Sequence, residues 1–92
     1  MAIFGYGRVS TSQQDTENQR LELEQAGWTF DFWFTDVVSG KVPAVQRKEF
    51  SEMLSKIRDG ETLVVAKLDR LGRDAIDVLQ DRKSTRLNSS HS

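Results

Sequence analysis

The sequence predicts an α/β fold in which a mainly parallel sheet is flanked by helices. Three segments have the length and apolar content of strands, and three others have helical periodicity. Because the two kinds of segment alternate along the chain, right-handed crossovers would join the strands in parallel. A length of 92 residues without an internal repeat leaves room for one small domain.

The first strand and helix are expected near the N-terminus. Residues 2–9 (AIFGYGRV) form a short apolar run whose glycines permit close approach of neighbouring segments. Residues 15–27 are expected to be helical, because Asp15 or Thr16 can cap the start and Gly27 can end the helix. The apolar side of this helix is thin and consists of Leu21, Leu23 and Ala26.

The second expected strand covers residues 28–36, where aromatic and polar residues alternate with the period of a strand. The alternation would place four aromatic rings on one face: Trp28, Phe30, Phe32 and Phe34. Such a face can be a core or a platform for stacking bases. We expect a core, because aromatic residues at strand spacing most often serve that purpose.

The second half of the chain repeats the alternation. Residues 47–60 predict a surface helix that ends at Gly60. Its apolar stripe is Phe50, Met53, Leu54 and Ile57. Residues 62–66 (TLVVA) read as a strand that is buried on both faces. A charged turn then leads into a helix, within residues 67–80, whose Ile76 and Leu79 would face inward.

Residues 81–92 differ in character from the rest of the chain. They are almost all charged or small and polar, with neither helical nor strand periodicity. Asp81 to His91 corresponds to the translation of a widely used short-read sequencing adapter. We therefore interpret residues 81–92 as a non-native tail, and we expect the native chain to continue past Gln80 with other residues.

The bulk composition excludes several classes of site. No cysteine is available for a disulfide or a thiolate zinc site, and no N-terminal segment resembles a signal peptide or a membrane span. A cytoplasmic protein is therefore expected. The 13 basic and 14 acidic residues give a net charge of -1, and leaving out residues 81–92 gives 10 and 13, or -3. Global charge is thus no indication of a nucleic-acid partner.

Two polar, basic turns follow the first and third expected strands. The first contains Arg8, Ser10, Thr11 and Gln14, and the second contains Lys67, Asp69, Arg70 and Arg73. In an open parallel sheet, ligands bind beyond the carboxyl ends of the strands. If these strands are neighbours, a serine would face several guanidinium groups, which is the outline of a phosphate site.

These residue types suit attack on phosphorus. Guanidinium groups supply planar, permanently charged donors for phosphate oxygens, and a serine hydroxyl needs activation by its surroundings. The only histidine, His91, lies in the suspect tail, so proton transfer would fall to Asp69, an arginine or water. Neither a metal cluster nor a P-loop is indicated. Taken singly, each turn could be an ordinary surface turn or a helix cap.

Three motifs in this order resemble the serine recombinases, the small resolvase and DNA invertase group. The first is Tyr6 to Thr11 with Gln14, Asp15 and Gln19, and the strongest is Val65 to Arg73 (VAKLDRLGR). Between them lie Asp36, Ser39 with Gly40, and Arg47 before the second helix. The resemblance covers residues 2–80 and implies a three-layer resolvase-like catalytic domain in residues 1–80.

The resemblance implies a role for each matching residue. Ser10 is the nucleophile that becomes joined to a 5′ phosphate of DNA, so that strands are exchanged and rejoined without ATP. Arg8, Arg47, Arg70 and Arg73 bind and activate the phosphate, and Asp69 transfers a proton or orients an arginine. The supporting positions are Tyr6, Gln14, Gln19, Ser39 and Lys67. The alignment of Arg47 depends on a loop of variable length.

The resemblance also implies partners: recombination-site DNA, with dimers that pair into tetramers, and no metal, cofactor or membrane. A prokaryotic cell, mobile element or phage is the expected origin. The family's interface helix and DNA-reading domain are missing, so we expect this chain by itself to be inactive. Two alternatives stay open, a phosphate- or DNA-binding module without catalysis and a partial translation product without a stable fold. Resolvase and invertase are not distinguished.

Overall fold

A computed structural model describes residues 2–10 and 13–89 of the protein. Its elements, in chain order, are β1 (Ile3–Val9), α1 (Gln13–Gln25), β2 (Phe32–Val37), the 3-10 helix η1 (Ala44–Gln46), α2 (Lys48–Lys56), β3 (Thr62–Val65), α3 (Leu68–Leu71), α4 (Arg73–Lys83) and β4 (Arg86–Ser89). The predicted α/β class is confirmed. No helix within the described ranges has both the length and the apolar character needed to cross a membrane.

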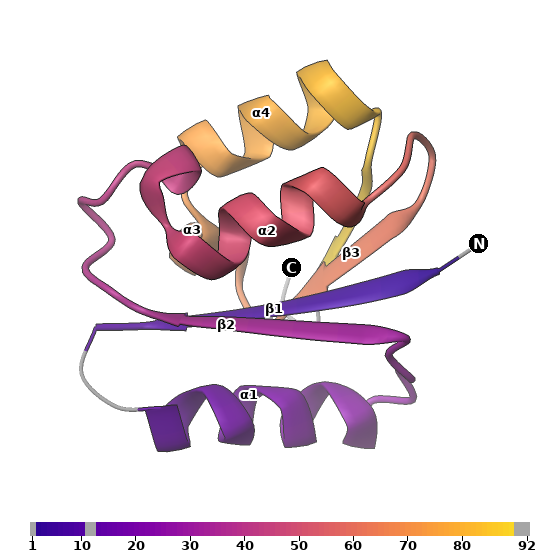
Figure 1. Ribbon diagram of the computed structural model, residues 1–92. Helices are drawn as coiled ribbons and strands as arrows, with labels where there is room; N and C mark the ends of the chain where they lie inside the picture. The colour runs from indigo at the N-terminus through magenta and orange to yellow at the C-terminus, as the bar shows by residue number, and fades with distance from the viewer. Residues whose placement is uncertain (1, 11–12, 90–92) are drawn as a thin grey trace.

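The strands form one parallel sheet in the order β2-β1-β3-β4. Helix α1 covers one face, and α2 and α4 cover the other, so the domain has three layers (Figure 1). The central strand β1 pairs with both β2 and β3. This arrangement confirms the parallel pairing that the alternation of strands and helices predicts.

The main core lies between the sheet and the α2 and α4 layer. The stripe of α2 predicted from sequence is buried there, because Phe50, Met53, Leu54 and Ile57 are each less than 9% exposed. Tyr6 meets the ring of Phe50 edge to face, with the ring centroids 5.5 Å apart. On α4, Leu79 faces inward as expected, and Ile76 packs against the same core while partly exposed. Apolar burial of this kind is the main stabilising contribution to the fold.

The four aromatic residues predicted to share one face near β2 do not all do so, because Phe30 lies on the opposite face, beside Trp33. Phe34 is buried in the main core, whereas Trp33 lies on the α1 side, 5.8 Å below the guanidinium of Arg20. Phe30 packs against Trp33, with the ring centroids 5.2 Å apart. The strand begins only at Phe32, so the period of two does not extend back to Phe30. Gly5 leaves the room that the Trp33 ring occupies.

The sequence predicted the end of helix α1 correctly but not its start. Its start at Gln13 places both predicted caps, Asp15 and Thr16, inside the helix, so the predicted start is wrong, and the side chain of Thr16 is buried. Its end is as predicted, because Gly27 adopts a φ of 104°. The amide of Trp28 donates to the carbonyl of Leu23 over 3.1 Å, which closes the last turn in a Schellman motif. Of the predicted apolar side, Leu23 is buried, while Leu21 is 55% exposed and Ala26 is exposed.

The segment after Gln80 has regular structure, which corrects the expectation of three strands and an irregular tail. Helix α4 continues to Lys83, and the chain then turns at Ser84, which has a φ of 47°. Strand β4 pairs in parallel with β3, with Leu87 opposite Leu63. Leu87 packs against the main core. The physical reason is that β3 offers an unpaired backbone edge, which even a polar segment can pair with.

Candidate active site

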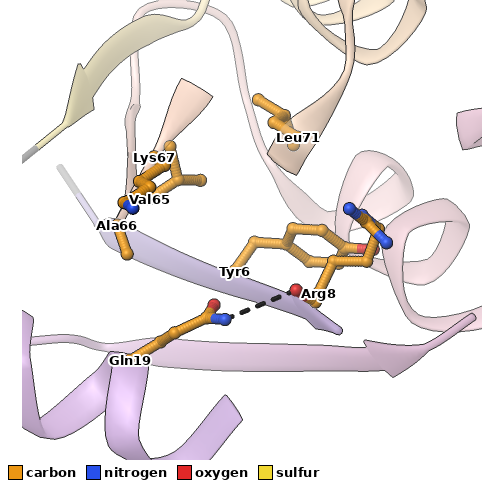
Figure 2. Close-up of a pocket in the computed structure, with 7 residues that line it drawn as sticks. All are labelled: Tyr6, Arg8, Gln19, Val65, Ala66, Lys67 and Leu71. Carbon is orange, nitrogen blue, oxygen red and sulfur yellow. Dashed lines mark hydrogen bonds between the residues drawn. The ribbon is translucent and has the colours of Figure 1, made fainter. Parts of the chain in front are cut away.

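The carboxyl ends of β1 and β3 lie at the same edge of the sheet. The strands pair in parallel with Gly5 opposite Val64, so the turns that follow them leave the sheet together. A small pocket lies at this edge (Figure 2). Its lining consists of Tyr6, Arg8, Gln19, Val65, Ala66, Lys67 and Leu71. The structure thus brings together the two basic turns, as predicted.

Arg8 is fixed by contacts with two other parts of the chain. Its Nη1 donates a hydrogen bond of 3.0 Å to the carbonyl oxygen of Val38, in the loop after β2. Its own carbonyl oxygen accepts a hydrogen bond of 3.4 Å from Nε2 of Gln19 (Figure 2). Gln19 belongs to α1 and is 7% exposed, which makes it a buried link between the helix and the site.

Ser10 lies directly beyond β1, two residues after Arg8. It occupies a bend and is exposed to solvent. It follows the end of a central strand, at the edge of the sheet where both basic turns begin. Thr11 and the side chain of Gln14, which belong to the same predicted turn, lie outside the described residues.

Asp36 organises the interior of the site, although the sequence analysis did not place it among the site residues. The Tyr6 hydroxyl donates a hydrogen bond of 2.7 Å to Oδ2 of Asp36. The backbone amides of Glu49 and Phe50 each donate to the same carboxylate over 3.0 Å. These two amides lie in the first turn of α2, where a negative charge is favourable. A carboxylate from β2 therefore caps α2.

The environment of Tyr6 holds its hydroxyl in the protonated form. Burial raises the pKa of Tyr6 well above its usual value. The hydrogen bond to Asp36 and the negative charge of that residue raise the pKa further, whereas Arg47 partly opposes both effects. The phenol of Tyr6 is thus a hydrogen-bond donor at neutral pH and has no capacity to act as a base.

Among the side chains that the structure describes, Arg47 is the largest that is fully buried, at 1% exposure. Its Nε donates to the carbonyl of Val42 over 3.1 Å, and its Nη1 donates to the carbonyl of Leu71 over 2.8 Å. Its Nη2 is buried and has no hydrogen-bond partner among the described residues. The guanidinium therefore joins the loop after β2 to the end of α3 and keeps one nitrogen unused.

The remaining predicted residues are less closely gathered. Lys67 is exposed at the start of α3 and lines the pocket, whereas Arg73 is exposed at the start of α4 and is not part of the lining. Ser39 is exposed, and its Oγ accepts a hydrogen bond of 3.2 Å from the amide of Lys41. The side chains of Asp69 and Arg70 lie outside the described part of the chain.

A second carboxylate, that of Asp74, was not singled out in the sequence analysis at all. Oδ2 of Asp74, in the first turn of α4, accepts a hydrogen bond of 2.8 Å from the amide of Ala44. For Asp36 the sequence held a signal, because this acid shares the inward face of its strand with Phe34. For Asp74 there was none, since its partner lies 30 residues away on a different element.

Comparison with known proteins identifies relatives of this arrangement. The family described as "Resolvase, N terminal domain" matches residues 3–88. The chain is 45% identical over 78 residues to the transposon Tn2501 resolvase of Escherichia coli. The aligned region covers 83% of this chain and 40% of the relative. It is 44% identical over 80 residues to the transposon Tn3 resolvase of Escherichia coli, covering 87% of this chain and 42% of the relative.

A solved structure shows the same fold. The crystal structure of a serine recombinase from Sulfolobus solfataricus matches with a TM-score of 0.77 and 26% identity, over 100% of this chain and 71% of the other. The chain spans about two fifths of the length of the two curated relatives, since the aligned regions cover 40% and 42% of their sequences. The sequence match over most of the chain and the shared sheet together show that this protein belongs to the resolvase N-terminal domain family of the serine recombinases.

Proposed function

We propose that the protein cuts and rejoins DNA at specific sites, with the Ser10 hydroxyl as the nucleophile. The serine oxygen attacks the phosphorus of a phosphodiester, a new P–O bond forms, and the bond to the 3′ oxygen breaks. The 3′ oxygen takes up a proton and leaves as a hydroxyl, while the 5′ phosphate stays on Ser10. Because the ester bond is retained, the reverse attack by a 3′ hydroxyl rejoins strands without ATP.

One observation carries this proposal: an exposed serine lies at the sheet edge where two basic turns meet, in a chain of the serine recombinase family. Phosphoryl transfer depends on charge stabilisation at the non-bridging oxygens. We assign this role to the guanidinium groups of Arg8, Arg70 and Arg73, and we place Lys67 and Ser39 in support.

Proton transfer is assigned to Asp69, with Gln14 and Gln19 in supporting roles. Tyr6 is unsuited to act as a base, because burial and Asp36 keep its pKa high. Asp36 is also unsuited, since it is 5% exposed and already accepts three hydrogen bonds. Their role in the proposal is to hold α2, and the Arg47 that precedes it, in place.

Arg47 enters the proposal as a phosphate-binding arginine with a second duty. Its unused Nη2 is the nitrogen available to a phosphate. Because the side chain is 1% exposed, the turn at Leu71 and Gly72 has to move before a phosphate reaches it. Its hydrogen bond to the carbonyl of Leu71 holds that turn until then.

The proposed partner is recombination-site DNA, bound by a dimer that pairs into a tetramer in a prokaryotic cytoplasm. A net charge of -1 gives this chain little nonspecific affinity for phosphates. Site recognition and assembly would depend on segments of the longer relatives that this chain does not span. We therefore expect the isolated chain to be inactive.

We further propose that residues 1–80 are the catalytic-domain sequence and that residues 81–92 are translated adapter. The correspondence from Asp81 to His91 supports this assignment, and the pairing of β4 with β3 is compatible with either origin. The nucleotide sequence decides the question. Adapter codons from Asp81 onward support the proposal, and a different coding sequence that overlapping reads confirm contradicts it.

The function is tested in a chimera that joins residues 1–80 to the remainder of the Tn2501 resolvase. Incubation with the DNA site on which that resolvase acts should give a covalent protein–DNA complex that survives denaturing electrophoresis. Ser10→Ala should abolish the complex and leave DNA binding intact. Ser55→Ala is the matched control, because Ser55 is exposed on α2 and its hydroxyl donates to the carbonyl of Glu52 in the same helix. A complex that persists in Ser10→Ala contradicts the assignment.

The same assay tests the alternative of a binding module. That alternative predicts that Arg8→Ala weakens DNA binding and that no variant, including the unsubstituted chimera, cleaves DNA. Arg20→Ala is the matched control, since this exposed arginine lies on α1 and pairs with Glu24 at 3.6 Å. Cleavage by the unsubstituted chimera eliminates the binding module.

A further inference from the structure

Two hydrogen bonds join the loop after β2 to the segment after β3. The amide of Ala44 donates to Oδ2 of Asp74 over 2.8 Å. Nη1 of Arg47 donates to the carbonyl of Leu71, also over 2.8 Å. We call this pair of bonds the clasp. Because α2 begins immediately after Arg47, the clasp fixes the start of that helix against the start of α4.

The clasp lies between the two halves of the candidate site. The loop on its first side, residues 38–46, provides the carbonyl of Val38 that holds the guanidinium of Arg8. The segment on its second side, residues 67–73, is the basic turn that opens into the pocket. The distance between the two halves is therefore set by the bonds of the clasp as well as by the pairing of β1 with β3.

The Asp74 carboxylate forms one bond of the clasp and lies near Gly72, the residue that follows Leu71 of the other bond. Its Oδ2 accepts a hydrogen bond from the amide of Ala44, a residue that is completely buried in the folded chain, and this amide loses its partner when Asp74 is removed. Its Oδ1 lies 3.2 Å from the point where a Cβ on Gly72 would be. Nη2 of Arg47 lies 3.4 Å from the same point. Gly72 thus forms a corner with the carboxylate on one side and the guanidinium on the other.

We propose that Asp74 is a positioning residue for DNA cleavage, which acts by holding Ala44 and thereby the placement of Arg47 relative to the Lys67 turn. This inference rests on the proposed function. It assigns Asp74 no contact with DNA, because its bonded oxygen faces the loop. The hydrogen bond, and not the negative charge, is the property that matters, so an amide at this position should serve almost as well.

The first test follows Arg47 in the present chain by NMR. Asp74→Ala should accelerate hydrogen exchange of the Arg47 Nε proton by about tenfold, because the loop that receives this proton is released. Asp74→Asn keeps an oxygen that accepts the Ala44 amide and should exchange at nearly the original rate. Asp77→Ala, an exposed acid one turn further along α4, is the control. Equal exchange rates in the unsubstituted chain and all three variants would overturn the proposal that Asp74 holds Arg47 through the clasp.

The second test measures cleavage in the Tn2501 chimera with saturating DNA, as a rate per folded molecule. Asp74→Ala should slow formation of the covalent complex on the order of tenfold to a hundredfold, with unchanged DNA affinity, as expected when catalytic groups are misplaced. Asp74→Asn should restore the rate. A merely structural role predicts the original rate per folded molecule, and equal slowing in both variants points to charge. Either result overturns the proposal.

A second variant that removes the same hydrogen bond keeps the test decisive if Asp74→Ala fails to fold. Ala44→Pro removes the amide donor without changing Asp74, and Pro43 already has the extended backbone (φ -55°, ψ 142°) that precedes a proline. The double variant should be no slower than either single variant, since all three lack the same bond. Additive slowing contradicts the inference. A chimera that cleaves no DNA even without substitution contradicts the proposed function instead, and the exchange rates then decide the clasp.

Discussion

The hydroxyl of Tyr6 donates a 2.7 Å hydrogen bond to Asp36, and the two side chains are 2% and 5% exposed. The same carboxylate accepts the amides of Glu49 and Phe50 at the start of α2. One buried acid thus joins β1, β2 and α2 beneath the candidate site. The stability of the domain and the order of the site should both depend on it.

Substitutions at Tyr6 and Asp36 should differ in their effect on stability. Tyr6→Phe keeps the ring against Phe50 and removes one of three hydrogen bonds to the carboxylate, at an expected cost of about 1–2 kcal/mol in the free energy of unfolding. Asp36→Ala also uncaps α2 and should cost about 3 kcal/mol or more. Urea denaturation measures both. Equal losses in the two variants would show that the carboxylate does not organise α2.

The raised pKa of Tyr6 predicts a loss of stability in alkali. Above the ordinary tyrosine value of 10.0 the unfolded chain releases the phenolic proton, whereas the folded chain keeps it. The unfolded state then binds fewer protons, so stability falls as the pH rises from that value. Tyr6→Phe should flatten this part of the profile. Because Tyr6 is the only tyrosine, the ultraviolet absorbance of tyrosinate follows it directly. Tyrosinate in the folded protein near pH 10.0 would contradict the burial.

Gly72 and Gly27 offer a matched pair for testing the corner beside Arg47. Their φ angles are similar, 98° and 104°, but a Cβ would meet Asp74 and Arg47 only at Gly72. Both alanine variants should lose about 1–3 kcal/mol through backbone strain. Gly72→Ala should lose more and should also slow cleavage in the chimera. Thermal unfolding and the cleavage rate measure these effects, and identical behaviour of the two variants would argue against a crowded corner.

Truncation tests whether β4 completes the sheet. Residues 1–80 alone lose the end of α4 and all of β4, which leaves the backbone edge of β3 unpaired. The midpoint of thermal unfolding should fall on the order of 10 °C. Sedimentation should also show association through the open edge. Residues 1–89 are the control. A cooperative transition in residues 1–80 at the temperature of the longer chain would show that β4 contributes nothing.

The parts of the fold that the sequence predicted are those set by local patterns. The period of α2 places Phe50 and Met53 inward, and the glycine at position 27 ends α1. The alternation predicted for residues 28–36 failed at Phe30, which packs against Trp33, because the pattern does not show that the strand begins only at Phe32. Strand β4 was missed for a related reason. Its polar residues carry no period, and the edge of β3 determines its conformation.

In the candidate site, too, some features were predictable from the sequence and others depend on packing. The two basic turns were predicted to meet, because parallel strands end at one edge of a sheet. The burial of Arg47 was not predictable, since an arginine before an amphipathic helix resembles an exposed residue in sequence. The bonds of Asp36 and Asp74 join residues 13 to 30 positions apart, and only the packed structure shows them.

The central claim, that Ser10 carries the DNA, is tested most directly by mass spectrometry of the covalent complex from the chimera. Trypsin cleaves after Arg8 and Arg20, so the reactive residue lies in the peptide from Val9 to Arg20 together with Thr11, Ser12 and Thr16. After nuclease digestion, fragmentation of this peptide should locate the 5′-phosphorylated nucleotide on Ser10. A nucleotide on another hydroxyl of the peptide, or on no residue of this chain, would contradict the claim.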